Sequence, residues 1–212
     1  MEDVEADTTV ENPGICPKSH CCLLRHASFQ HFLFNALNSA VSLCAQNPNQ
    51  AAELLILISD YLRAGLQEEN TIIPLQVELD YVRSYLSIQK VRFGDRLEIE
   101  YDILPGISCP VPPFVLLHIV DNGIRHGIMK RKSGGRIKVS VSRAGIFARI
   151  VVEDNGIGIP ERLLPQLLLE THPEWSLPKL NKVLYTYCGA GLRIESPPEG
   201  GTRVCLEIAA AG

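Results

Sequence analysis

Apolar residues recur at helical spacing in three stretches of the first half of the chain. From Ser28 onward, one face carries Leu33, Leu37, Val41 and Cys44. After a break at Asn47-Pro48-Asn49, a second face carries Leu54, Leu55, Ile58, Tyr61 and Leu62. A third stretch, from Pro74 to about Arg92, carries Leu75, Leu79, Val82 and Leu86. These periods predict three helices. Proline is accepted in the first turn of a helix and ends a helix elsewhere, so Pro48 and Pro74 mark boundaries between them.

The second half of the chain shows the alternation that predicts strands. Apolar and polar residues alternate in residues 97–103, 137–141 and 148–152, and a turn at Ala144-Gly145 joins the last two into a hairpin. Two more strands are expected at residues 191–195 and 203–208, and an apolar helix at residues 111–126. The proline-rich stretch of residues 161–187 is expected to be irregular. Helices followed by this mixed order predict an α+β fold.

The first two predicted helices are joined by a short connection, so we expect an antiparallel hairpin. Such a hairpin cannot bury both of its apolar faces by itself. A second copy would cover them by completing a four-helix bundle. The pattern therefore predicts a homodimer formed through residues of about 28–67.

Composition narrows the classes of function. Of the 212 residues, 46% are hydrophobic and 21% charged, which is typical of a globular protein. The net charge of −4 does not favour a nucleic-acid partner. The longest apolar stretch, residues 54–58, is too short for a membrane span, and the acidic start MEDVEAD is unlike a signal peptide. We expect a cytoplasmic protein.

The seven cysteines are odd in number and have no framework spacing, so reduced thiols are favoured over disulfides. Residues 1–27 are polar and are expected to form a mobile tail. This tail holds Cys16, His20, Cys21, Cys22 and His26. The cluster could bind a metal or sense redox state, but it matches no standard zinc spacing, and a plain tail is the simpler interpretation.

The segment VVEDNGIGIP, residues 151–160, places a carboxylate in a glycine-rich turn. Asp154 ends an apolar run, and Gly156 and Gly158 follow it. Glycine allows close approach of the backbone to a ligand, and a carboxylate there can accept a hydrogen bond from the amine of adenine. The same Asp-Asn-Gly letters are also common in plain turns.

A second group of polar residues lies in the predicted helix of residues 111–126. The spacing places Asp121, Asn122, Arg125 and His126 on one side. An asparagine oxygen can coordinate Mg²⁺, Arg125 and His126 can contact phosphates, and Asp121 can act as a base or hold Arg125. The same residues would also suit an ordinary helix end.

His31 lies on the polar stripe of the first helix, together with Asn35, Asn38 and Ser42. A lone histidine in such a place is by default a surface residue. If a phosphoryl donor binds elsewhere in the chain, however, neutral imidazole can attack a γ-phosphoryl group. Asn35, one turn later, could then orient the ring by a hydrogen bond.

Five segments in order resemble the cytoplasmic core of the LytS/YehU-type sensor histidine kinases. QHFLFNALN at 30–38 is similar to the phosphoacceptor motif and LQVELDYVRSYLSIQKVRFGDRLEIE at 75–100 to the middle segment. PPFVLLHIVDNGIRHG at 112–127 resembles the asparagine box, EDNGIGIP at 153–160 the first glycine box, and GLRIESPPEGGTRVCLEI at 191–208 the closing strands. The second half as a whole resembles the GHKL ATP-binding domain.

This resemblance implies a helical dimerisation and phosphoacceptor region at residues 28–93 and a GHKL-type α/β sandwich at residues 94–212. It also implies a role for individual residues. His31 would be phosphorylated, Asn122 would ligate Mg²⁺ and Asp154 would bind the adenine amine. Gly156 and Gly158 would line the nucleotide, and Thr202 would assist Asp154.

The sequence departs from the family pattern in three places. Gln30 stands where a proline is usual, and Asp121 where a glutamate is usual. The second glycine box aligns with EWSLPK at 174–179, which has no glycine. There Glu174 would repel phosphates, while Lys179 could attract them. The prolines of this stretch also predict a lid without regular structure in the absence of ligand.

The resemblance implies a kinase that moves the γ-phosphoryl group of ATP to His31, with Mg²⁺ as cofactor, and then to an aspartate of a response regulator. The changed glycine box leaves a second interpretation, a dimeric scaffold or regulatory partner with weak or no ATP turnover. A third is a GHKL protein that phosphorylates a serine or threonine of a partner, against which the helical hairpin with His31 argues.

Overall fold

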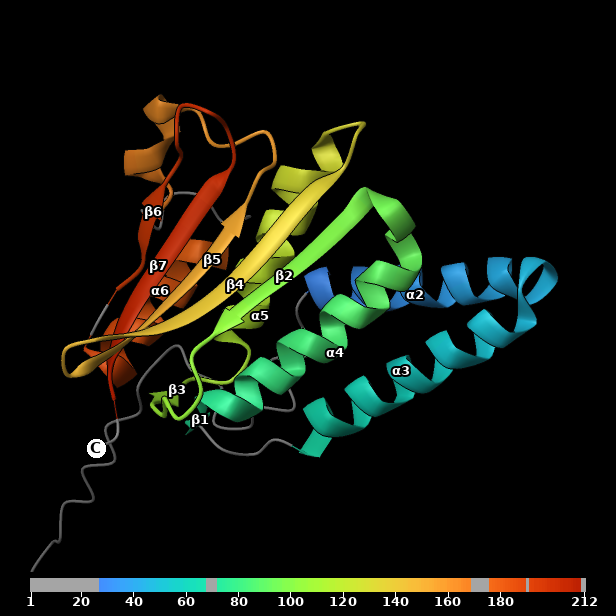
Figure 1. Ribbon diagram of the computed structural model, residues 1–212, viewed down its shortest axis with the longest axis horizontal. Coiled ribbons are helices and arrows are strands. Elements are labelled where there is room, and N and C mark those ends of the chain that lie inside the picture. Colours follow the sequence, from blue (N-terminus) through green and yellow to red (C-terminus); the bar gives the residue numbers. More distant parts are fainter. Residues whose placement is uncertain (1–26, 68–71, 169–175, 190, 211–212) are drawn as a thin grey trace, which may run out of the picture.

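The computed structural model of the chain describes residues 27–67, 72–168, 176–189 and 191–210. It begins with helices α2, Ala27–Gln46, and α3, Pro48–Gln67, which form the predicted antiparallel hairpin (Figure 1). Asn47 separates them, and its side-chain oxygen accepts a hydrogen bond from the backbone N–H of Gln50 at 3.2 Å, as residues at helix starts commonly do. Residues 1–26 of the predicted tail, which include its Cys/His cluster, lie outside the described residues.

Helix α4, Leu75–Phe93, lies between the hairpin and the rest of the molecule (Figure 1). It begins at Leu75, one residue after the predicted start at Pro74, and ends before Gly94, whose φ of 55° suits glycine. Because α4 contacts both α3 and α5, its residues are buried on two sides. Strand β1, Ile73–Pro74, precedes α4 and forms a short antiparallel ladder with β3, Pro110–Val111, which was not predicted.

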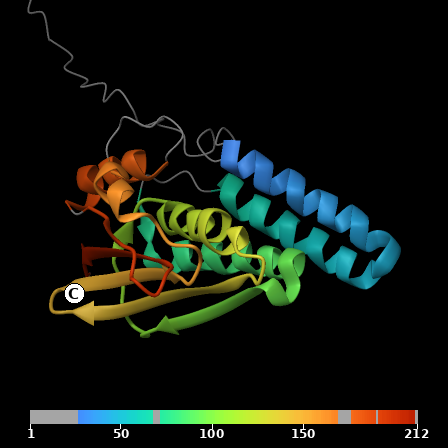
Figure 2. The same ribbon diagram turned by 90° about the horizontal axis from the view of Figure 1, so that it is seen from above.

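A five-stranded sheet forms the second layer. Its strand order is β2 (Leu97–Ile103), β4 (Gly135–Ala144), β5 (Phe147–Asp154), β7 (Thr202–Ala209) and β6 (Arg193–Glu195). Strands β2 and β4 are parallel, and the other neighbours are antiparallel. Alternate residues of the three central strands are buried: Ile137, Val139, Val141, Ala148, Ile150, Val152, Val204, Leu206 and Ile208. Helices cover this one face (Figure 2), and the predicted α+β class is confirmed.

Helix α5, Val115–Asn122, starts later than predicted. The prolines before it hold extended backbone, so Val111 belongs to β3. The turn into the helix passes through Phe114, whose φ of 66° is left-handed. After Asn122 the chain continues as the π-helical turn η2, Gly123–Gly127, and the 3₁₀ turn η3, Ile128–Lys130. The asparagine box therefore lies on a helix whose last turn is widened.

The prediction that residues 161–187 are irregular is wrong for most of that stretch. It contains a 3₁₀ turn, η4, at Glu161–Gln166 and a helix, α6, at Ser176–Cys188. Helix α6 forms because Leu177, Leu180 and Leu184 share one face that packs inward, while Pro178 occupies the first turn, where no intrahelical N–H bond is lost. Residues 169–175, with Glu174, lie outside the described part of the chain.

The buried face of α2 is displaced by one residue from the face that the apolar pattern indicated. Phe32, Ala36 and Ala40 are buried, whereas Leu37 and Val41 are 38% and 71% exposed. Small alanine side chains let α2 pack closely, and the larger apolar residues remain at the surface of this single chain. None of the helices that the structure describes is both long enough and apolar enough to cross a membrane.

Candidate functional site

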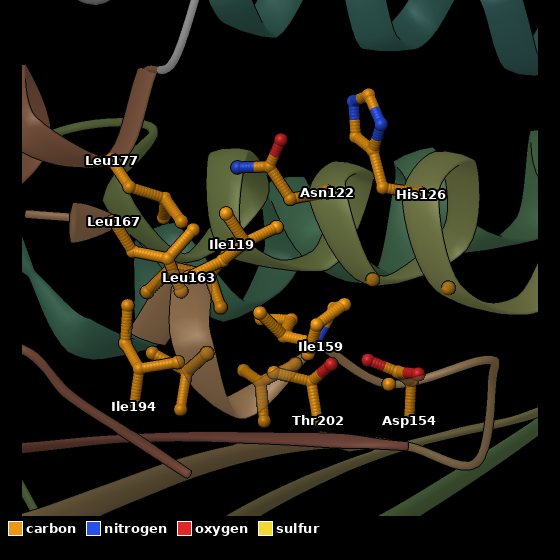
Figure 3. A pocket seen from close by; sticks show the side chains of 16 residues that line it. Ile119, Asn122, His126, Asp154, Ile159, Leu163, Leu167, Leu177, Ile194 and Thr202 are labelled. Atoms are coloured by element: carbon orange, nitrogen blue, oxygen red, sulfur yellow. The ribbon is translucent and has the colours of Figure 1, made fainter. Parts of the chain in front are cut away.

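A cavity of about 310 Å³ lies between helix α5 and the ends of strands β5 and β7 (Figure 3). Asn122 and His126 lie on its helix side, and Asp154 and Thr202 on its strand side (Figure 3). Most of its wall is aliphatic: Ile119, Val152, Ile159, Leu163, Leu167, Leu177, Ile194 and Val204. An apolar slot with a few polar groups at its ends suits a flat heterocycle.

Asp154 and Thr202 face each other because of the sheet register. They are the paired residues at the end of β5 and the start of β7. The backbone N–H of Gly156 donates to Asp154 Oδ1 at 2.8 Å. Burial raises the pKa of Asp154 to about 6, although hydrogen bonds from Gly156 and Thr202 act in the opposite direction. The carboxyl group is therefore desolvated and held in place, as a group that selects a ligand amine should be.

The glycines around Asp154 are required by close packing. Gly158, with a φ of 71°, lines the cavity. Gly156 does not line it, and a side chain there would collide with the backbone of Gly127. A side chain at Gly127 would collide with the Asp154 carboxylate, so this glycine also shapes the site. Sequence reasoning quoted Gly127 within the asparagine box but assigned no role to it.

Ser196 supports the glycine loop and was missed altogether. Its hydroxyl accepts a hydrogen bond from the backbone N–H of Ile159 at 2.9 Å and donates one to the carbonyl of Gly201 at 2.8 Å. It thereby joins the loop after β5 to the turn before β7. Serine residues in loops are too common for the sequence to have indicated this contact.

The four polar residues of the asparagine box divide between two cavities. Asn122 and His126 line the cavity with Asp154, while Asp121, Arg125 and His126 line a neighbouring one. Asp121 is buried; Tyr85 donates to its Oδ1 at 2.6 Å and Arg125 to its Oδ2 at 3.3 Å. The pKa of His126 is lowered by burial and by the charge of Arg125, which favours the neutral ring.

The neighbouring cavity, about 280 Å³ in volume, contains His31. Its wall combines the start of α2, the end of α4 and the asparagine box, with Asn35, Gln89, Arg92, Lys130 and the three box residues among its members. The amide nitrogen of Asn35 lies 3.0 Å from Nδ1 of His31 and 3.2 Å from Nε2, so it can donate to the ring. His126 lines both cavities and marks where they adjoin.

Lys179, like Gly156, lines neither cavity. It is exposed in the first turns of α6. From the described part of the aligned glycine box, residues 176–179, only Leu177 reaches the cavity with Asp154. That contribution is aliphatic and offers no hydrogen-bond donor to a phosphate.

A polar face of α4 completes the surroundings of the asparagine box and was not predicted. Tyr85, Gln89 and Arg92 follow one another at helical spacing. Gln89 donates to the hydroxyl oxygen of Tyr85, and Arg92 to the side-chain oxygen of Gln89, each at 2.5 Å. With the bond from Tyr85 to Asp121, this face connects the asparagine box to the His31 cavity.

Comparisons with known proteins identify the family of the chain. Residues 23–97 match the family described as histidine kinase, and residues 114–211 match the family of histidine kinase-, DNA gyrase B- and HSP90-like ATPases. YwpD of Bacillus subtilis is 37% identical over 182 residues, which are 84% of this chain and 66% of that protein. The sensor protein LytS of Bacillus subtilis is 34% identical over 187 residues, 84% of this chain and 32% of LytS. The chain thus spans about a third of the LytS relative.

Solved structures show the same fold at low sequence identity. The match to the catalytic domain of histidine kinase ThkA covers 66% of this chain and 95% of the ThkA chain, with a TM-score of 0.53 and 16% identity. The match to the histidine kinase domain of a blue-light activated kinase from Erythrobacter litoralis covers 84% of this chain and 95% of that domain's chain, with a TM-score of 0.51 and 17% identity. The chain belongs to the sensor histidine kinase family that includes the LytS proteins, and its second half is a histidine kinase-type ATPase domain.

Proposed function

We propose that the chain is the core of an ATP-dependent protein-histidine kinase that phosphorylates itself on His31. One observation carries this proposal: the His31 cavity and the cavity with Asp154 adjoin at His126 within one chain. A nucleotide held by the cavity with Asp154 would therefore direct its phosphates toward the His31 cavity. A scaffold without catalysis has no need of this arrangement.

The residues present fit an adenine nucleotide and Mg²⁺. In the proposed binding mode, the desolvated carboxylate of Asp154 accepts a hydrogen bond from the adenine amine, and Thr202 supports it. The aliphatic walls contact the faces of the ring. The Asn122 side-chain oxygen would hold Mg²⁺, an ion that typically takes only one or two protein ligands. When bound, Mg²⁺ would neutralise part of the negative charge of the phosphates.

The residues of the His31 cavity have distinct parts in the transfer. A ring nitrogen of His31 attacks the γ-phosphorus; a nitrogen–phosphorus bond forms, the bond from phosphorus to the bridging oxygen breaks, and ADP leaves with that electron pair. The ring proton passes to solvent. Asn35 keeps the ring oriented through its hydrogen bond. Both oxygens of Asp121 already accept hydrogen bonds, so Asp121 is better suited to positioning Arg125 than to acting as a base.

The proposed partners are a second copy of the chain and a response regulator. Exposed apolar residues on the hairpin would be covered by a second hairpin, as the four-helix bundle requires. The regulator is proposed from the family and from the complex of ThkA with the response regulator protein TrrA, whose kinase matches 77% of this chain with a TM-score of 0.52. We place the reaction in the cytoplasm, where ATP is available.

Incubation of the chain with Mg²⁺ and ATP labelled at the γ-phosphate tests the proposal. We expect acid-labile, base-stable label on the wild type and none on His31→Gln, because glutamine has a similar size but no nucleophilic nitrogen. Asn122→Ala should also abolish labelling, by loss of Mg²⁺-dependent binding. Calorimetry with ADP serves as the control, since His31→Gln should bind it as the wild type does. Label that persists in His31→Gln would place the acceptor elsewhere.

The lid region favours a second candidate function, a regulatory partner with weak ATP turnover. The described part of the aligned glycine box is the first turn of α6, contains no glycine and gives the cavity one leucine, so it lacks the glycine turn that would wrap the phosphates. ATP should then have little advantage over ADP in affinity. A wild type that binds ADP but shows no label after prolonged incubation would favour this function over the kinase.

A further inference from the structure

The guanidinium group of Arg92 is incompletely satisfied in the structure. Arg92 lies near the end of α4 and lines the His31 cavity. Its Nη1 donates to Gln89, but its Nε is buried and has no hydrogen-bond partner among the described residues. Such orphaned buried donors are rare in native proteins and often mark the place of a water or an ion.

The charges around Arg92 indicate which kind of ligand is missing. The cavity is lined by three cationic side chains, Arg92, Arg125 and Lys130, and by one carboxylate, that of Asp121. Asp121 already forms an ion pair with Arg125. Within the described residues, neither Arg92 nor Lys130 has an ion pair with an acidic side chain. The cavity therefore has an excess of positive charge beside His31 and suits an anion.

We propose that this cavity is a binding site for a phosphoryl group and that Arg92 holds the phosphoryl group carried by His31. The proposal rests on the proposed function of His31 as phosphoacceptor. A phosphoryl group presents three oxygens with up to two negative charges, and a guanidinium can donate two parallel hydrogen bonds to such a group. Nε–H is one of the donors suited to this pairing; it has no partner among the residues that the structure describes, and because it is buried the side chain would turn to present it to the phosphoryl group.

The structure also offers a purely structural interpretation of Arg92, which the test must separate. The guanidinium lies 4.9 Å from the centre of the Phe93 ring and is bonded to Gln89, so it also packs the end of α4. A packing role predicts that substitution changes stability only. A phosphoryl site predicts that substitution changes the reactivity of His31 toward a phosphate donor and the ionisation of the phosphoryl group itself.

Potassium phosphoramidate is the probe, because it phosphorylates histidine without ATP, Mg²⁺ or the nucleotide cavity. A ring nitrogen of His31 attacks the phosphorus, the new nitrogen–phosphorus bond forms, and ammonia leaves with the broken bond's electrons after taking up a proton. Arg92→Gln should slow this loading at least about tenfold, the factor expected for the loss of one hydrogen bond between charged groups. In ³¹P spectra, the phosphoryl titration midpoint should lie at higher pH in Arg92→Gln than in the wild type, because a nearby cation favours the dianion.

Two variants serve as controls. Arg92→Lys keeps the charge but not the planar fork, so its loading rate should lie between those of the wild type and Arg92→Gln. Arg83→Gln removes a guanidinium from the same helix that pairs with Asp80 at 2.7 Å and lines neither cavity, so it should load as the wild type does. Thermal unfolding and ADP binding show whether each variant is folded. If Arg92→Gln does not fold, the comparison of Arg92→Lys with the wild type decides.

The possible results separate this proposal from the proposed function. A wild type that phosphoramidate does not load at His31, or an Arg92→Gln variant with the wild-type rate and titration midpoint, would overturn the phosphoryl site. If ATP leaves the wild type unlabelled while phosphoramidate loads His31 in an Arg92-dependent way, the kinase activity fails and the phosphoryl site stands.

Discussion

The carboxyl group of Asp154 combines burial with a short hydrogen bond from the backbone, and this makes nucleotide binding dependent on pH. Its pKa is raised to about 6, chiefly by burial. Only the ionised group is a pure acceptor for the adenine amine. We therefore expect ADP affinity to be constant above pH 7 and to fall roughly tenfold by pH 5, where about a tenth of the group remains ionised. Calorimetry from pH 5 to 8 measures this.

The sign of the effect on folding is opposite to that on binding. Because the folded pKa lies above that of an unfolded aspartate, the nucleotide-free folded state binds more protons between pH 4 and 6. The contribution of Asp154 to the free energy of unfolding therefore decreases as pH rises through that window. Asp154→Asn should lose both effects while retaining the shape of the side chain. An unchanged pH profile of ADP affinity in Asp154→Asn would assign the titration to another group.

At the scale of residues, the sequence predicted the side chains that would contact a ligand better than the residues that hold those side chains in place. Asp154, Thr202 and Asn122 belong to recognisable local motifs, and the structure brings them to one cavity. Tyr85 and Ser196 lie within the quoted family segments, but no role was assigned to either. Tyr85 bonds to Asp121, 36 residues away, and Ser196 to Ile159, 37 residues away, and such contacts depend on how distant elements pack. Lys179 was aligned with a motif position, and the structure places it outside the cavity.

At the scale of elements, helix α5 depends on a side chain supplied by α4. Glu78 is fully buried, and its carboxylate accepts hydrogen bonds from the backbone N–H groups of Phe114, Leu116 and Leu117 at 2.6, 2.8 and 3.2 Å. These N–H groups belong to the start of a helix and have no partner within it. Glu78 therefore performs from another helix the task that an N-cap residue usually performs locally.

We expect Glu78→Gln to lower the free energy of unfolding by roughly 2 kcal/mol, since glutamine has one acceptor oxygen and would turn an N–H₂ group toward a backbone donor. For a chain of this size, that corresponds to a fall in Tm of about 4–8 °C. Urea unfolding measures the change, and hydrogen exchange should show faster exchange at residues 114–117. Glu98→Gln, at an exposed position, is the matched control. Equal stability of the two variants would contradict this role of Glu78.

The elements themselves were predicted where periodicity is long and uninterrupted. The two hairpin helices and α4 have repeating apolar faces over about 20 residues, and the central strands alternate clearly. Helix α6 was missed because the prolines of residues 161–187 were given more weight than the spacing of the leucines in α6. The exact buried face of α2 could not be predicted either. The set Phe32, Ala36 and Ala40 and the set Leu33, Leu37 and Val41 both have helical spacing. Only the packing of α2 against α3 and α4 decides which set is buried.

At the scale of the whole molecule, the hairpin presents apolar residues that one chain leaves exposed. Phe34 and Val41 on α2 are 67% and 71% exposed, and Ile56 on α3 is 61% exposed. We expect a homodimer in which these residues pack between copies, and Val41→Lys with Ile56→Lys should yield monomers, because burial of unpaired charges is unfavourable. Sedimentation equilibrium at micromolar concentration measures the mass. Ile146→Lys, at an equally exposed position of the β4–β5 turn (74%), is the control.

The arrangement of the two cavities predicts which chain of a dimer receives the phosphoryl group. His31 and Asn122 of one chain lie in cavities that adjoin at His126 of that same chain, so we expect transfer within a chain. Mixed dimers with differently sized tags test this, one chain carrying His31→Gln and the other Asn122→Ala. Each chain then lacks either the acceptor or the Mg²⁺ ligand, and transfer within a chain should give no label. Dimers of wild type with His31→Gln, which should be labelled on the wild-type chain alone, show that the kinase is active in this format. Label on the Asn122→Ala chain would mean that the acceptor histidine is reached from the partner's nucleotide site.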